Sequence, residues 1–270
     1  MSRASRAGRL RQQLGERDLA ILATLRQQRL LTGQQLRRLF FPDGNRVTQA
    51  RKTRATFKRL AELRLVVRLR RRVGGVHAGS EGHAVGLSGL GHAVLDVGEA
   101  SPRRHRAVTE TKLAFQEHVL AISQLYVELV ERSRLGEAEL LEFQAEPACW
   151  RRFTGIGGQA ITLKPDAFVR LGIEDYEVVA FIELDMATES VPTIVRKLGV
   201  HIDYWRSGQE EHHHGVHPRV WWLVPDVARS KAIARALQRV PDEAQDLFTL
   251  ALSDEAPEQL TQFPSIGGES

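Results

Sequence analysis

The chain has 270 residues, which suits two modest domains, and its 42% hydrophobic content is enough to bury a core in each. Its single cysteine, Cys149, excludes an intrachain disulfide and fits a reducing compartment such as the cytoplasm. There is no run of about 18 apolar residues, so no membrane span is predicted. The basic first residues are not followed by the apolar stretch of a secretory signal.

The charges are distributed unevenly along the chain. Residues 1–108 contain 23 Lys and Arg against 7 Asp and Glu, a net charge of +16. Residues 109–270 contain 15 against 26, a net charge of −11. Because a basic domain attracts the phosphates of nucleic acid, this division predicts DNA binding by the first half.

The first half is predicted to begin with a flexible basic arm over residues 1–15, followed by a domain over 16–100. Apolar residues recur there at helical spacing, and glycines separate two short apolar runs near the end. The predicted elements are three helices and a two-stranded ribbon: Glu16–Gln28, Gly33–Phe40 preceded by the N-cap residue Thr32, Arg46–Leu63, and the strands Leu65–Arg72 and Ala84–Leu87.

The third of these helices carries apolar residues on one side and basic residues on the other. Helix, helix, basic helix and ribbon is the order of a winged helix-turn-helix, whose third helix enters the major groove while the ribbon contacts the DNA backbone. A solvated helix face is the alternative interpretation of the same charges. The predicted contacts to double-stranded DNA are Arg46, Arg51, Lys52, Arg54 and Lys58 of the helix and Arg70, Arg71 and Arg72 of the ribbon.

The second half follows a basic linker over 101–108 and is predicted to form one domain over 109–252, with a disordered tail over 253–270. It opens with a long amphipathic helix at Thr109–Arg132. A polar loop is predicted at Glu210–His217, and its four histidines point in different directions, so they do not predict a metal site. The other predicted elements are the strands Leu140–Pro147, Ile161–Leu171, Val178–Asp185, Arg219–Val224 and Leu247–Leu252 and the helices Thr188–Arg206 and Ala228–Arg239.

Three carboxylates stand at the ends of two of these strands. Asp166 precedes the apolar run of one strand, while Glu183 and Asp185 share one face of the next because strand side chains alternate. If the strands form a hairpin, the three carboxylates converge and repel one another unless a hard cation such as Mg²⁺ or Mn²⁺ binds them. The alternative is that Asp166 caps a turn and the other two are solvated.

Pro165-Asp166, a strand, and then Glu183 and Asp185 resemble the signature of the PD-(D/E)xK nuclease superfamily. The resemblance implies that the Asp and Glu bind a divalent metal and that a lysine two residues after the Glu positions the attacking water. Asp185 stands where that lysine is expected, and Lys197 on the following helix is a substitute of a kind known in the superfamily. The candidate catalytic residues are therefore Asp166, Glu183, Asp185 and Lys197, of which the three carboxylates are candidate ligands of Mg²⁺ or Mn²⁺.

Residues 16–252 as a whole resemble the replication-relaxation family of plasmids and mobile elements. The resemblance implies an α+β or α/β fold: a winged helix-turn-helix followed by a PD-(D/E)xK nuclease-like mixed-sheet domain flanked by helices. It also implies plasmid replication and DNA relaxation as the process served. The residues that carry it are Arg17, Asp18, Leu31, Thr32, the segment Leu36 to Phe41, Arg59, Leu60, Leu63, Lys164, Pro165, Asp166, the segment Phe181 to Asp185, Thr188, Glu189, Lys197 and Leu198.

Three functions are consistent with these residues. The first is a DNA-binding accessory protein of plasmid or mobile-element replication or relaxation, with a degenerate nuclease-like domain and replication or transfer proteins as partners. The second is a metal-dependent endonuclease or nickase directed to its site by the winged helix. The third is a transcriptional repressor that forms a homodimer through its second domain. A lysine at position 185 would have favoured the second, and its replacement favours the first.

Overall fold

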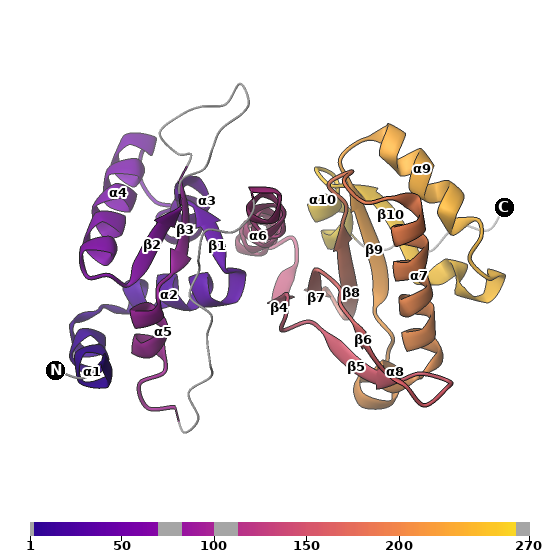
Figure 1. The fold of residues 1–270 in the computed structure, drawn as a ribbon. Helices are drawn as coiled ribbons and strands as arrows, with labels where there is room; N and C mark the ends of the chain where they lie inside the picture. The colour runs from indigo at the N-terminus through magenta and orange to yellow at the C-terminus, as the bar shows by residue number, and fades with distance from the viewer. Residues whose placement is uncertain (1–2, 70–82, 100–112, 263–270) are drawn as a thin grey trace. The chain divides into compact units, whose positions relative to one another are not determined.

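The computed structural model describes residues 3–69, 83–99 and 113–262, which fall into two compact units, 1–127 and 128–270 (Figure 1). The fold combines helices with a mixed five-stranded sheet flanked by helices, as predicted. The ribbon residues Arg70, Arg71 and Arg72 and the predicted linker over 101–108 lie outside the described residues. None of the described helices is long and apolar enough to cross a membrane.

The first unit has the predicted order of helices and strands. Its antiparallel sheet has the strand order β1-β3-β2, and α4 packs on α3 and β2. The predicted N-cap is confirmed, since the Thr32 side chain accepts a hydrogen bond from the backbone of Gln35 at 3.1 Å. The elements are α1 (Arg3–Gln13), α2 (Glu16–Gln28), β1 (Leu30–Thr32), α3 (Gly33–Phe40), α4 (Arg46–Glu62), β2 (Val66–Leu69), β3 (Ala84–Leu87), α5 (Gly89–Leu95) and the first part of α6 (Leu113–Arg134).

The flexible arm predicted over residues 1–15 is corrected by the helix α1. Ala7, Leu10 and Leu14 recur at helical spacing and are buried, and α1 packs on α5. Arg11 also donates a hydrogen bond from Nη1 to the carbonyl oxygen of Val94 in α5, at 3.1 Å. Arg3 and Arg9 of this helix are exposed.

The second unit is built on a mixed sheet with the strand order β10-β9-β8-β7-β4 (Figure 1). Strands β4, β7 and β8 are antiparallel neighbours, and β9 and β10 continue the sheet in parallel with β8. The elements after α6 are β4 (Glu139–Ala145), β5 (Arg151–Thr154), β6 (Ala160–Leu163), β7 (Ala167–Ile173), β8 (Tyr176–Leu184), α7 (Val191–Arg206), α8 (Gln209–His214), β9 (Arg219–Val224), α9 (Val227–Leu237), the 3-10 helix η1 (Asp242–Leu247), β10 (Phe248–Leu252) and α10 (Ala256–Thr261).

Three predictions for this unit are corrected. The single strand predicted over Ile161–Leu171 is two strands of different sheets, because Pro165 has no N–H to continue a ladder, and β6 pairs instead with β5. The polar loop predicted at Glu210–His217 is largely the helix α8. The predicted tail over 253–270 contains the helix α10, which Leu260 holds on the unit through its buried side chain.

One face of the five-stranded sheet is covered by α7 and α9 (Figure 1). Phe181 of β8 and Trp222 of β9 meet Ile194 and Leu198 of α7 and Ile233 of α9 in one buried cluster. Side chains alternate along a strand, so the residues two positions beyond Phe181 point toward the same helices. Glu183 is therefore directed into the space between the sheet and α7.

Candidate functional site

Helix α4 presents a continuous basic face to solvent. Thr53, Phe57 and Leu60 are buried against the first unit, and the side of the helix opposite them is exposed. Lys58 lies 4.0 Å from Glu62, one turn further on, and both of these side chains are well exposed. The predicted contact residues of this helix, Arg46, Arg51, Lys52, Arg54 and Lys58, are all exposed.

Helix α4 is held in place by an ion pair that does not involve this face. Arg59 donates to the buried carboxylate of Asp18 at the start of α2, at 2.5 Å. Both residues are among those that carry the family resemblance. The pair fixes α4 against α2, so the exposed side chains extend from a rigid helix.

The acidic pair of the second unit comes from neighbouring strands. Ala167 pairs with Ile182, and the backbone N–H of Asp166 donates to the carbonyl of Ile182 at 2.9 Å. Continuing this register by one residue places Asp166 opposite Glu183, on the face covered by α7. Their residues are only 8% and 2% exposed, and Asp166 accepts from the backbone N–H of Leu184 at 2.8 Å. The predicted approach of these two carboxylates is therefore present.

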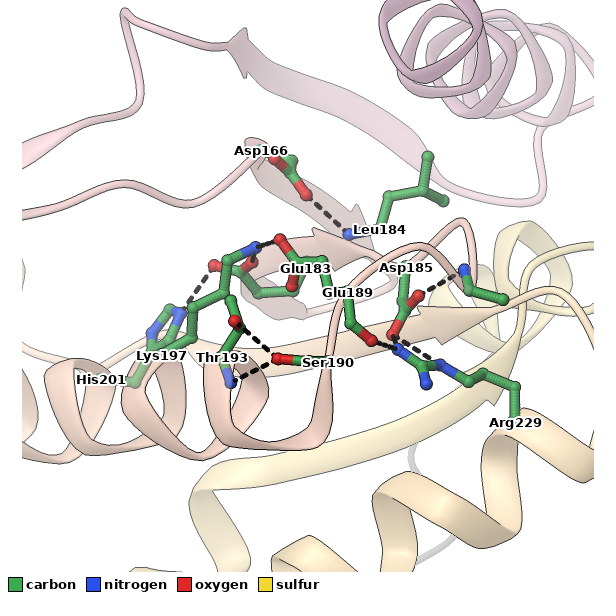
Figure 2. Close-up of polar contacts among 11 residues, drawn as sticks. Asp166, Glu183, Leu184, Asp185, Glu189, Ser190, Thr193, Lys197, His201 and Arg229 are labelled. Carbon is green, nitrogen blue, oxygen red and sulfur yellow. Dashed lines mark hydrogen bonds and ion pairs between the residues drawn. The ribbon is translucent and has the colours of Figure 1, made fainter. Parts of the chain in front are cut away.

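Helix α7 supplies two donors to Glu183 (Figure 2). Lys197 and His201 follow Ile194 at the spacing of one helix face, so they point toward the sheet. Lys197 Nζ lies 3.0 Å from Glu183 Oε2, and His201 Nε2 lies 2.9 Å from Glu183 Oε1. Both carboxylate oxygens of Glu183 are thus engaged by side chains of α7.

Lys197 is a permanent cation in this site. Burial by itself would lower the pKa of Lys197, but the negative charges of Glu183, Asp166 and Glu189 outweigh burial and raise the pKa above its ordinary value. Glu189 also forms an ion pair with Lys197 at 2.9 Å. A lysine with a raised pKa can stabilise negative charge, but it cannot accept a proton from water at neutral pH.

Asp185 has a different partner from the other two carboxylates. Its Oδ2 accepts from Arg229 Nε at 2.9 Å and from Arg229 Nη2 at 2.6 Å, and its Oδ1 accepts from the N–H of Ala187 (Figure 2). Arg229 also donates to the carbonyl oxygen of Glu189 at 2.7 Å. The predicted convergence of three carboxylates is therefore corrected: Asp166 and Glu183 are together, while Asp185 is bound to α9.

The carboxylates that a hard cation would use already have partners within the protein. Mg²⁺ and Mn²⁺ favour oxygen ligands, and Asp166, Glu183 and Asp185 were the predicted carboxylates. Glu183 and Asp185 use both of their oxygens as hydrogen-bond acceptors, and the positive charges of Lys197 and Arg229 already compensate them. Among the described residues, no group of three or more His, Cys, Asp or Glu side chains is placed to hold a metal ion.

Two residues of this site are absent from the sequence prediction. His201 lies one helical turn after Lys197. Residues at this i, i+4 spacing share a helix face, so the sequence indicated that both could reach the same carboxylate. Arg229 gave no such signal, because it is separated from Asp185 by β9 and becomes its partner only when α9 packs on the sheet.

A second buried polar cluster is formed around Glu210 of α8 and His217, which precedes β9. Glu210 is 3% exposed and accepts from Arg151 Nε at 2.6 Å and from the Tyr204 hydroxyl at 2.8 Å. His217 packs on the rings of Phe181 and Tyr204, and neither of its ring nitrogens has a hydrogen-bond partner among the described residues. Burial lowers the pKa of His217 to about 4; Glu210 opposes this shift and His201 adds to it.

We expect acid to destabilise the protein through His217. Its folded pKa of about 4 lies below the ordinary 6.5, so between these values the unfolded chain binds a proton that the folded chain does not. The resulting loss of unfolding free energy is on the order of 2 kcal/mol between pH 7 and pH 5. Urea unfolding at both pH values should show a smaller loss in His217→Gln than in wild type. His212→Gln, which changes an exposed histidine of α8, is the control; equal losses in both variants would contradict this assignment.

Comparison with protein families gives a match. A family model described as replication-relaxation covers residues 22–220, which include the α4 face, the acidic pair and Lys197. Neither a comparison with curated proteins nor one with solved structures finds a match.

Proposed function

The chain belongs to the replication-relaxation family, and from this premise we propose that it is a DNA-binding protein of plasmid or mobile-element replication or relaxation. The proposed contact to duplex DNA is the basic face of α4. The process follows from the family, whereas the contact residues are argued from their position in the first unit.

The observation that carries this proposal is that the basic side chains of α4 are exposed while the apolar ones are buried. Arg51, Arg54 and Lys58 recur at intervals of three and four residues, so they form one row along the helix. A row of cations on a rigid helix is suited to the phosphates that border the major groove. The helix is also the third of the first domain predicted from the sequence, which is the position of the recognition helix in winged helix-turn-helix domains.

Equilibrium binding to a duplex tests this function. We expect the full chain to bind a labelled duplex of mixed sequence, with an affinity that falls roughly a thousandfold between about 50 and 200 mM salt if about six phosphates are contacted. The steep decrease is expected because each neutralised phosphate releases condensed counterions. Fluorescence anisotropy at several salt concentrations provides the measurement. Absence of binding at low salt would remove DNA binding from the proposal.

In this proposal the second unit serves as a structural or protein-contact module. The supporting observation is that the buried charges of its acidic site are compensated within the protein. Lys197 neutralises Glu183, and Arg229 neutralises Asp185. A compensated site is stable without further partners.

A second candidate is metal-dependent strand cleavage, and the position of Lys197 favours it. The side chain of Lys197 reaches Glu183 beside Asp166, so an aspartate, a glutamate and a lysine are together as the superfamily resemblance implies. Mg²⁺ or Mn²⁺ bound to this pair would compete with Lys197 and His201 for the oxygens of Glu183.

We therefore expect weak Mn²⁺ binding and at most slow nicking of supercoiled plasmid. Calorimetric titration of Mn²⁺ into wild type and Asp166→Ala measures the first, and gel analysis of plasmid topology in Mg²⁺ or Mn²⁺ measures the second. Arg196→Ala, which removes an exposed cation of the same helix as Lys197, is the control. Fast cleavage that is lost in both Asp166→Ala and Lys197→Ala but kept in Arg196→Ala would rank cleavage above the accessory function.

A further inference from the structure

The two-stranded ribbon β5–β6 has one face on the core and one face in solvent. Arg152 pairs with Thr162, and Phe153 pairs with Ile161. Phe153 and Leu163 belong to the buried cluster of the second unit. Because side chains alternate, Arg152 points away from that cluster, and it is exposed.

Trp150 and Lys164 extend this outer face beyond the ends of the two strands. Arg151 pairs with Leu163, so the same register places Trp150 opposite Lys164. Lys164 Nζ lies 5.0 Å from the centroid of the Trp150 ring, within the range of a cation–π contact. The Trp150 residue is 38% exposed, and Lys164 is exposed. The outer face thus combines one accessible indole with two cations.

The base of the ribbon is anchored next to the acidic pair. The buried Cys149 donates from Sγ to the carbonyl oxygen of Pro165 at 3.0 Å, between Lys164 and Asp166. Arg151 is bound by Glu210, which is itself buried. The indole and the two cations therefore extend from fixed backbone positions rather than from a loose hairpin.

We propose that this outer face, formed by Trp150, Arg152 and Lys164, binds single-stranded DNA. Charge complementarity selects a polyanion, since Arg152 and Lys164 present two cations on one exposed face. The exposed indole selects an unpaired strand, because bases in a duplex already stack on one another and an unpaired base can stack on an aromatic ring. The inference rests on the proposed DNA function and adds a second, chemically different contact in the second unit.

The test uses the full chain carrying Arg51→Glu and Lys58→Glu, so that binding at the basic face of α4 does not mask binding at the ribbon. The probe is a labelled oligothymidylate at low salt. All four tryptophans lie in the second unit, and Trp150 is the one most exposed, so binding is expected to quench intrinsic emission. Adding Trp150→Ala is expected to weaken binding roughly tenfold, and Trp150→Phe to retain most of it.

Two further variants separate stacking from charge. Arg152→Gln with Lys164→Gln should lower the magnitude of the salt slope for the single strand by about 1.4, that is by about 0.7 for each phosphate that is no longer neutralised. Tyr176→Ala, which removes an exposed aromatic residue at the start of β8, is the matched control and should bind like its parent.

The outcomes separate this inference from the proposed function. Equal single-strand affinity in the parent, Trp150→Ala and the double glutamine variant would overturn the ribbon site, as would absence of single-strand binding. Failure of wild type to bind duplex DNA would overturn the proposed function instead. Duplex binding by a chain that carries only Trp150→Ala is expected to equal that of wild type.

Discussion

Reversing two charges on α4 is expected to weaken duplex binding strongly. In Arg51→Glu with Lys58→Glu, two attractive interactions with phosphate become repulsive, one at each end of the basic row. Hydrogen bonds to charged groups contribute about 1.5–3 kcal/mol each, so removing two corresponds to a decrease in affinity of roughly a hundredfold or more at low salt. Anisotropy with the same duplex measures the change.

A matched charge reversal elsewhere separates local contact from net charge. Arg196 and Lys231 are exposed basic residues on α7 and α9, and reversing both changes the net charge by the same amount. If α4 is the contact surface, Arg196→Glu with Lys231→Glu should alter duplex affinity by only a small factor. Equal losses in the two double variants would contradict the assignment of α4.

Removing Arg229 is expected to destabilise the second unit strongly. Asp185 is 3% exposed, and in Arg229→Ala its carboxylate would be a buried charge without its counterion. Breaking a buried pair in this way costs about 3–5 kcal/mol. Arg229→Ala combined with Asp185→Asn should be less destabilised than Arg229→Ala alone, because position 185 then carries no unpaired buried charge. Urea unfolding of the three proteins measures both effects.

An exposed ion pair of similar geometry provides the control. Arg206 and Glu243 approach to 2.7 Å, close to the 2.6 Å between Arg229 and Asp185, but their side chains are 41% and 58% exposed rather than 14% and 1%. Surface pairs contribute much less than buried ones because water and salt screen their charges. If Arg229→Ala lowers the free energy of unfolding by no more than Arg206→Ala does, burial does not decide the strength of the Asp185 pair.

Local patterns in the sequence were sufficient for much of the fold. The spacing of Ala50, Thr53, Phe57 and Leu60 predicts the inner side of α4, and the last three of these residues are buried while Ala50 is partly buried. The expectation that Asp166 approaches Glu183 depends on a hairpin of their two strands, and the antiparallel register of β7 and β8 brings these residues together. These predictions succeeded because each depends on residues that are close in sequence or on adjacent strands.

The errors arose where distant packing decides the outcome. Alternation also puts Asp185 on the face of Glu183, yet Arg229, over 40 residues later, binds it and separates the two carboxylates. Composition alone suggested a flexible arm at residues 1–15, but three small or apolar residues are enough to pack α1 on α5. The strand β5 has only four residues and is recognisable mainly through its pairing with β6.

The salt dependence of duplex binding by wild type and by Arg51→Gln with Arg54→Gln tests the central claim most directly. Both substitutions remove charge without adding repulsion, and both residues are exposed on the same face of α4. If α4 binds phosphates, the slope of log affinity against log salt should decrease in magnitude by about 0.9 for each phosphate that is no longer neutralised, or about 1.8 in the double variant. Parallel lines for wild type and variant would show that these residues do not touch the DNA backbone.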